Sequence, residues 1–285
     1  MLNTEQWASF EKDGFLIVPN YLKEEEADDL RERMTEILEE IEVDHQSVFT
    51  TNQQTRTSDS YFLESGDKIR CFFEAVEVEE TDKKLKINKV GHALHDLEEV
   101  FQKISYKQEL YEIACQFGHQ DPAIIQSQYI FKSPKVGGNV APHTDSTFLY
   151  TEPLSCLGVW IALEDVDQEN ACLWGLPKVH KTHPIYQRFH RNETNDGTAF
   201  SDVLEQKTKW NLNDLRPLEV KKGDMILLHG SNVHLSYANH SERSRHAYVL
   251  HLIDNQAHYP QDNWLQRTDL PLQTMREVMG MTKNI

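Results

Sequence analysis

Histidines and acidic residues form the most chemically suggestive pattern in the chain. The 285 residues include 14 His, and the triplet H-x-D occurs twice, at His119–Asp121 and at His143–Asp145. The first triplet follows a predicted helix end and precedes Pro122, so we interpret it as a turn. The second leads into the β-rich run Phe148–Thr151, which predicts a strand. Because side chains two residues apart in a strand point to the same side, we expect the imidazole and carboxylate of this second triplet to converge.

An imidazole and a carboxylate from one strand edge are two of the ligands of a 2-His-1-carboxylate metal site. A later strand should deliver the third ligand, and the candidates are His229, His234, His240, His246 and His251. The predicted strand Met225–Leu228 leads towards His234, and Arg245 opens the next apolar run, so a return strand would bring Arg245 near His234. A guanidinium beyond a metal can hold the far carboxylate of a dicarboxylic acid, and Ser236 could add a hydroxyl.

Helices are expected to dominate the first part of the chain. Thr4 as a cap and Gly14 as a stop predict a helix over residues 1–14. An apolar stripe at helical spacing predicts a second helix over Lys23–Ile41. Asp96–Lys103 and Gln108–Phe117 also have helical patterns.

From Ile124 onwards, short β-rich runs alternate with turn signals. The predicted strands are Ile124–Phe131, Phe148–Thr151, Gly158–Leu163, Met225–Leu228 and Ala247–Ile253. Residues 181–215 are polar and weakly patterned, so we expect them to leave the core as a long excursion. Helices followed by many short strands indicate a mainly β fold with flanking helices (α+β) around a jelly-roll core. We predict one domain over residues 1–285, with a helical N-terminal part over about 1–120 and the core over about 121–260.

Composition excludes several classes of function. The net charge of −17 argues against non-specific nucleic-acid binding and against docking on an anionic membrane. The longest apolar run, Leu157–Leu163, is far too short to cross a bilayer. The four cysteines have no C-x-x-C spacing, which is typical of reduced, buried thiols. No signal peptide is evident, so we expect a cytoplasmic protein, and a monomer.

The pattern His143-x-Asp145, followed by H-x-S-x-x-N-x₅-R from His234 to Arg245, resembles the phytanoyl-CoA dioxygenase family. That family is a branch of the Fe(II)/2-oxoglutarate oxygenases. Six further segments also resemble it: Asp59–Phe73, Ile87–His95, Ile125–Lys132, Ser146–Pro153, Gly158–Ala162 and Glu169–Trp174. The resemblance covers nearly the whole chain and implies a double-stranded β-helix (jelly-roll, cupin-like) core.

The resemblance also implies a role for each site residue. His143, Asp145 and His234 would bind Fe(II), which makes them the catalytic centre. Arg245 and Ser236 would hold the 5-carboxylate of 2-oxoglutarate. The family suggests three more contacts to this cosubstrate, from Lys89, Gln128 and Trp160. The implied reaction uses O₂ to hydroxylate a C–H bond and releases succinate and CO₂. An intact Asp145 favours hydroxylation, because related halogenases replace this carboxylate with a small residue.

The chain departs from the family pattern at two loops. The family usually has an Asn-Gly pair and a Pro-Gly-Ser-His turn, where this chain has Asn170-Ala171 and Pro177-Lys178-Val179-His180. The lost glycines should alter a loop near the mouth of the site. This departure bears on the shape of the substrate more than on iron chemistry, because the three ligands are intact.

Two other readings remain open from the residues. The same ligands would serve a cupin-like protein with another metal, although Arg245 and Ser236 would then have no role. A non-catalytic oxygenase fold used for binding is the second. The substrate is not specified: a small or lipid-like molecule is expected. An aromatic pocket wall could be formed by Tyr61, Phe62, Phe72, Phe148, Tyr150 and Trp174.

Overall fold

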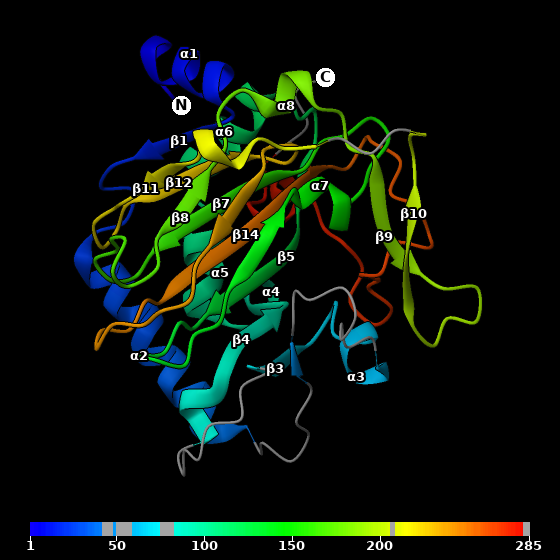
Figure 1. Cartoon of the computed structure of the whole chain (residues 1–285). Helices are drawn as coiled ribbons and strands as arrows, with labels where there is room; N and C mark the ends of the chain where they lie inside the picture. Colours follow the sequence, from blue (N-terminus) through cyan, green and yellow to red (C-terminus); the bar gives the residue numbers. More distant parts are fainter. Residues whose placement is uncertain (42–47, 50–58, 75–82, 206–208, 282–285) are drawn as a thin grey trace.

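The computed structural model describes residues 1–41, 48–49, 59–74, 83–205 and 209–281. Its centre consists of two β-sheets, with helices against the outer side of the larger sheet and a separate two-stranded hairpin (Figure 1). Two polar or charged stretches, residues 44–60 and 77–86, are predicted from the sequence as loops, and they lie largely outside the described residues.

The larger sheet has eight strands in the order β1-β12-β7-β14-β5-β4-β3-β2. Its strands are β1 (Phe15–Val18), β2 (Val48–Phe49), β3 (Ile69–Glu74), β4 (Ile87–His92), β5 (Pro122–Ile130), β7 (Leu157–Ala162), β12 (Met225–His229) and β14 (Ala247–Asp254). The smaller sheet has the order β11-β8-β13-β6. Its strands are β6 (Val140–His143), β8 (Leu173–Gly175), β11 (Arg216–Leu218) and β13 (His234–Ser236). Strands β9 (Gln187–Arg191) and β10 (Thr198–Asp202) form the separate hairpin.

The longer helices are amphipathic, and α1 ends at its predicted stop. The helices are α1 (Thr4–Asp13), α2 (Glu24–Glu40), α3 (Ser60–Leu63), α4 (Leu94–Leu97), α5 (Glu99–Ser105), α6 (Gln108–Phe117), α7 (Asp145–Phe148), α8 (Val179–Thr182) and α9 (Met275–Val278), with 3-10 turns at Lys83–Lys86 and Leu212–Asp214. Helix α1 ends at Gly14 in the left-handed conformation, with φ 80°, where glycine is favoured. Its cap is Asn3 rather than Thr4.

Side chains alternate between the two faces of the central strands β7 and β14. Tyr248 and Leu250 pack into the outer hydrophobic cluster together with Leu30 of α2. Val249, on the opposite face, belongs to a second cluster that includes Leu173 of the smaller sheet. The alternation therefore gives the larger sheet one face for the helices and one face for the interior between the sheets.

The fold confirms the predicted mainly β architecture with flanking helices, and it corrects three details. Phe148–Thr151 is not a strand: Phe148 ends α7 and the following residues form a loop. The single helix predicted over Asp96–Lys103 is divided into α4 and α5 at Glu98, whose backbone is extended. The N-terminal part is not purely helical, since β1, β3 and β4 belong to the larger sheet. Among the described residues, no helix is long and apolar enough to cross a membrane.

Candidate active site and metal centre

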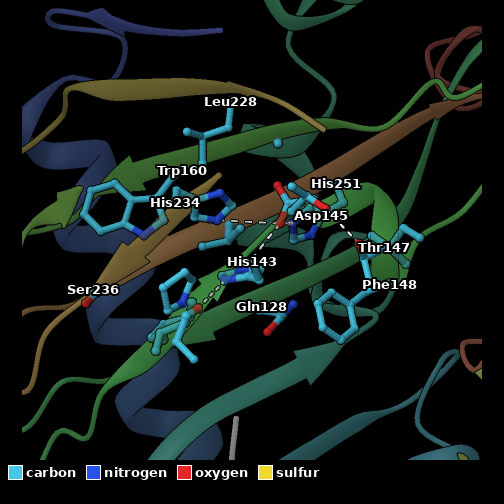
Figure 2. Close-up of a pocket in the computed structure, with 18 of the residues that line it drawn as sticks. Gln128, His143, Asp145, Thr147, Phe148, Trp160, Leu228, His234, Ser236 and His251 are labelled. Atoms are coloured by element: carbon cyan, nitrogen blue, oxygen red, sulfur yellow. Dashed lines mark hydrogen bonds and ion pairs between the residues drawn. The ribbon is translucent and has the colours of Figure 1, made fainter. Parts of the chain in front are cut away.

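Two neighbouring strands of the smaller sheet bring His143 and His234 together. His143 ends β6, and it lies directly opposite His234 at the start of β13 in the antiparallel register. Residues opposite one another in such a pair have closely spaced side chains, and the two imidazole rings are 4.2 Å apart between centroids. Figure 2 shows both rings directed towards Asp145.

Asp145 reaches the same point by a different route from the one predicted. Strand β6 ends at His143, and Asp145 is the first residue of the short helix α7. The turn into this helix, and not strand alternation, directs the carboxylate towards the histidines. Its space is provided by Gly158 on β7, where a Cβ atom would lie 2.7 Å from Asp145 Oδ2.

The geometry of this cluster suits a metal ion. The ligand atoms of His143, Asp145 and His234 all lie within 4.8 Å of one another. In both histidines, Nε2 is 3.7 Å from Asp145 Oδ1. The other ring nitrogen, Nδ1, faces a backbone carbonyl. In His143 it lies 2.9 Å from the Ala141 oxygen, and in His234 it lies 3.3 Å from the Asn232 oxygen. Nδ1 therefore carries the proton and Nε2 is left as a ligand atom.

The carboxylate is held in its charged form. Burial opposes ionisation of Asp145, but His234 and His251 outweigh it and place the pKa of the carboxyl well below its ordinary value. Asp145 Oδ2 is buried and has no hydrogen-bond partner among the described residues. A buried anion between two imidazole nitrogens fits a divalent cation.

A third histidine, His251, contacts this carboxylate; it was one of the five candidates for the third ligand, and the family resemblance selected His234 instead. The Nε2 atom of His251 is 3.4 Å from Asp145 Oδ1, and its Nδ1 is 3.0 Å from the side-chain nitrogen of Gln126. The strand register explains the contact, because His251 lies between Gln126 on β5 and Gly158 on β7. The sequence did contain a signal for this contact. Side chains in a strand repeat every two residues, so His251 lies on the same face of β14 as Val249.

Arg245 and Ser236 meet in the interior, as predicted. Arg245 is 1% exposed; its Nη2 donates to Ser236 Oγ at 3.0 Å and its Nε to the Ala171 carbonyl at 3.2 Å. Its guanidinium carbon lies 5.3 Å from the centroid of the Trp160 ring. Burial lowers the pKa of Arg245 to about 10. Its Nη1 is buried without a hydrogen-bond partner among the described residues, so one donor remains for a ligand.

Lys89 and Gln128 also line the cavity. In the register of the larger sheet, Gln128 lies opposite Val249, which in turn lies opposite Trp160. Lys89 is 5% exposed and lies opposite Ile130. The structure therefore brings the eight predicted site residues to one cavity of about 730 Å³. Figure 2 shows Gln128 and Trp160 on different sides of the histidine and aspartate cluster.

A buried lysine in this cavity was also missed. Lys132 is 2% exposed, and its Nζ donates to the carbonyls of Gly138 and Tyr237. Burial, with Arg245 nearby, lowers the pKa of Lys132 to about 6. Six aromatic residues were predicted to line the pocket. Phe62 and Phe148 do line the cavity, whereas Tyr61, Phe72, Tyr150 and Trp174 do not. His119, as expected for a turn residue, is absent from the cluster and is 2.6 Å from the Ser155 carbonyl through Nε2.

Comparison with known proteins decides the family. The family model described as Phytanoyl-CoA dioxygenase (PhyH) matches residues 10–247. The chain belongs to the phytanoyl-CoA dioxygenase family. A Dictyostelium discoideum relative, "Phytanoyl-CoA dioxygenase domain-containing protein 1 homolog", is 46% identical over 93% of this chain and 96% of its own. The Mus musculus protein "Phytanoyl-CoA dioxygenase domain-containing protein 1" is 41% identical over 95% of this chain and 97% of its own. These relatives confirm the predicted family resemblance.

Membership of the phytanoyl-CoA dioxygenase family confirms the predicted enzyme class, a dioxygenase, and with the His–Asp–His cluster it supports Fe(II) and 2-oxoglutarate as cofactors. Solved structures show the same fold. The "non-heme alpha ketoglutarate dependent carbocyclase SnoK from nogalamycin biosynthesis" has a TM-score of 0.64 and 20% identity, over 95% of this chain and 96% of that one. "EctD from S. alaskensis with 2-oxoglutarate and 5-hydroxyectoine" has a TM-score of 0.64 and 16% identity, over 95% and 85%.

The two departures from the phytanoyl-CoA dioxygenase family pattern fall on left-handed backbone. Ala171 has φ 73° and Lys178 has φ 71°, which are conformations that glycine adopts more easily. Ala171 lies at the site itself, since its carbonyl accepts a hydrogen bond from Arg245. Its backbone therefore keeps the glycine-like conformation although the residue has changed.

Proposed function

We propose that this protein is an Fe(II)- and 2-oxoglutarate-dependent dioxygenase that hydroxylates a C–H bond of a small or lipid-like substrate. The observation that carries the proposal is the presence, in one cavity, of a His–Asp–His cluster and a buried arginine with a donor still available. Arg245 and Ser236 have no evident purpose in a metal site that lacks a dicarboxylate cosubstrate. This pairing favours the oxygenase over a cupin-like protein with another metal.

His143, Asp145 and His234 are the proposed Fe(II) ligands. Iron bound there with 2-oxoglutarate supplies oxygen activation, coupled to the release of succinate and CO₂. The carbonyls of Ala141 and Asn232 orient the two imidazole rings, and His251 contacts the same carboxylate oxygen, Asp145 Oδ1, as those rings do. A metal held by only these three side chains would still be able to bind cosubstrate and O₂. Gly158 leaves room for Asp145, and a retained carboxylate favours hydroxylation over halogenation.

The cosubstrate is proposed to lie along the inner face of the larger sheet. The guanidinium of Arg245 and the hydroxyl of Ser236 would bind its 5-carboxylate, since they already lie 3.0 Å apart. Trp160 supports the guanidinium from its ring face. Lys89 and Gln128 complete the proposed binding site from β4 and β5. Burial of these groups excludes water and strengthens their electrostatic interaction with the dianion.

The setting of this activity is also part of the proposal. We infer one domain, a monomer in the cytoplasm and no nucleic-acid partner. The net charge of −17 and the four free cysteines support this setting.

The test is to mix the protein anaerobically with Fe(II) and 2-oxoglutarate, record the visible charge-transfer band, then admit O₂ and quantify succinate. We expect the band and succinate from the wild type, and no succinate from His143→Ala or Arg245→Ala. His119→Asn is the matched control, because it changes the other H-x-D triplet, and it should retain both signals. An iron-loaded wild type without band or succinate would refute the oxygenase and favour another metal or a binding role.

A further inference from the structure

The β9–β10 hairpin covers one side of the cavity and is held there by its arginines. Within the described residues, its strands pair with neither the larger nor the smaller sheet. Arg191 donates to the carbonyls of Leu63 and Trp264 at 2.6 Å and 3.1 Å. Arg188 forms an ion pair with Asp262, and its guanidinium lies 5.4 Å from the Tyr150 ring centroid. Arg188 and Arg191 therefore already have partners, and these contacts anchor the hairpin. Figure 1 shows the hairpin beside α7 and apart from the sheets.

The hairpin and the neighbouring helix α7 present an aromatic surface to the cavity. We call it the aromatic wall, and it consists of Phe148, Phe189 and Phe200. Phe189 and Phe200 lie opposite one another in the hairpin register, with ring centroids 5.0 Å apart. Phe148 of α7 lies 5.4 Å from Phe189 and 6.2 Å from Phe200. It also lies 5.9 Å from the ring of His143. The aromatic wall thus begins at a proposed iron ligand and extends outwards along the hairpin.

Charge is distributed unevenly around the cavity. Among the described lining residues, the lysine and arginine side chains are Lys89, Lys132 and Arg245. They belong to one end of the sheet, because Lys132 pairs through its backbone with Arg245 and Lys89 lies in the same row as Ile130 and Ala247. The cations therefore lie where a dicarboxylate cosubstrate would bind. The other described lining residues that come from the hairpin and its neighbours are uncharged: Phe62, Phe148, Leu149, Tyr186, Gln187, Phe189, Phe200, Trp210 and Trp264.

We propose that the aromatic wall binds an uncharged, apolar, ring-containing small molecule and presents one of its C–H bonds to the iron. This inference rests on the proposed function and adds its substrate class. Aromatic side chains favour flat or alicyclic rings through stacked and edge contacts. Among the described lining residues, an anion at the aromatic wall would meet no lysine or arginine to offset its loss of water. A cavity of about 730 Å³ is of the size that holds a drug-sized ligand. An acyl-CoA would place phosphates near a hairpin whose arginines are already engaged.

The test compares probes that share a ring system and differ in charge. Naphthalen-2-ylmethanol, naphthalene-2-carboxylate and decanoyl-CoA are titrated by calorimetry into the anaerobic protein containing Fe(II) and 2-oxoglutarate. We expect the neutral alcohol to bind at least about tenfold more tightly than the carboxylate, because the carboxylate must bury its charge. Phe200→Ala should weaken alcohol binding by about tenfold through lost ring contact. Phe200→Lys should reverse the preference in favour of the carboxylate.

The controls separate folding from binding. Trp7→Leu removes a half-buried aromatic ring on α1, away from the cavity-lining residues, and it should leave the alcohol affinity within about twofold. Thermal unfolding of each variant checks that the hairpin remains folded. Equal or tighter binding of the carboxylate or of decanoyl-CoA overturns the inference, and so does an unchanged affinity in Phe200→Ala. Succinate is assayed in the same preparations: selective alcohol binding without succinate refutes the oxygenase but keeps the ligand class, whereas succinate with an anion preference refutes the ligand class alone.

Discussion

His251 shows how a residue outside the ligand set can shape a metal centre. Its Nδ1 accepts a hydrogen bond from the Gln126 amide at 3.0 Å, which leaves the proton on Nε2, the atom that faces Asp145 Oδ1 at 3.4 Å. A donor in this position orients the carboxylate before any metal arrives. Groups that orient ligands in this way commonly contribute a tenfold to hundredfold factor to metal affinity.

We therefore predict that His251→Phe lowers the Fe(II) affinity by about 10- to 100-fold. The ring is retained in size, but the donor to Asp145 is lost, so the carboxylate can rotate away from the two imidazoles. Anaerobic calorimetry with Fe(II) measures the change. The control is His119→Asn, which replaces another buried histidine. This variant should bind Fe(II) like the wild type. An unchanged dissociation constant in His251→Phe would show that Asp145 is positioned by α7 and Gly158 alone.

At the scale of the elements, the loop before α8 carries an unfavourable backbone conformation. Lys178 is exposed and has φ 71°, at the position where the family pattern has glycine. A side chain in this region crowds its own backbone. Lys178 also donates a backbone hydrogen bond to the Asp13 carbonyl at 3.1 Å, which holds the conformation in place.

Lys178→Gly should accordingly raise the free energy of unfolding by about 0.5 to 1 kcal/mol, since relief of the left-handed strain exceeds the added entropy of the unfolded chain. Urea denaturation measures it. Lys181→Gly is the contrasting variant, because Lys181 lies inside α8 and glycine there should destabilise by a similar amount. Equal effects of the two substitutions would mean that backbone strain at residue 178 is negligible.

The elements also show what the sequence could predict. The runs that became β5, β7, β12 and β14 were recognisable because they are β-rich, buried and bounded by turns. Helix α7 was not recognisable, since one helical turn has too few residues to show a period. The residues that the family motifs point to, including Lys89 and Gln128, all line the cavity. The contact of His251 with Asp145 and the place of Lys132 in the cavity were missed, because both depend on which strands become neighbours, and that order is non-local.

At the scale of the whole molecule, the segment that follows Trp264 joins the N-terminal and C-terminal parts. Arg267 forms an ion pair with Asp96 near the end of α4, and Tyr106 donates to the same carboxylate at 3.0 Å. Asp67 accepts backbone hydrogen bonds from Thr268 and Asp269 at 2.8 Å and 2.6 Å. These contacts hold residues 267–269 against the helices and the β3 side of the larger sheet, so stability should depend on the two carboxylates remaining charged.

The pKa of Asp96 gives this dependence its direction. Burial opposes ionisation of Asp96, but His95 and Arg267 outweigh it and lower the pKa below the ordinary value of 3.8. The unfolded state therefore binds the proton more readily than the folded state. The contribution of Asp96 to stability is present above pH 3.8 and is lost as the pH falls through the lower folded value.

Asp96→Asn should cost about 2 kcal/mol of unfolding free energy near pH 7, because Arg267 is left buried without its anion. The difference from the wild type should shrink as urea unfolding is measured from pH 7 down to pH 3. Asp29→Asn, at an exposed site on α2, should follow the wild type at every pH. If the Asp96→Asn and wild-type curves instead stay parallel to pH 3, the buried pair with Arg267 does not hold the two parts of the chain together.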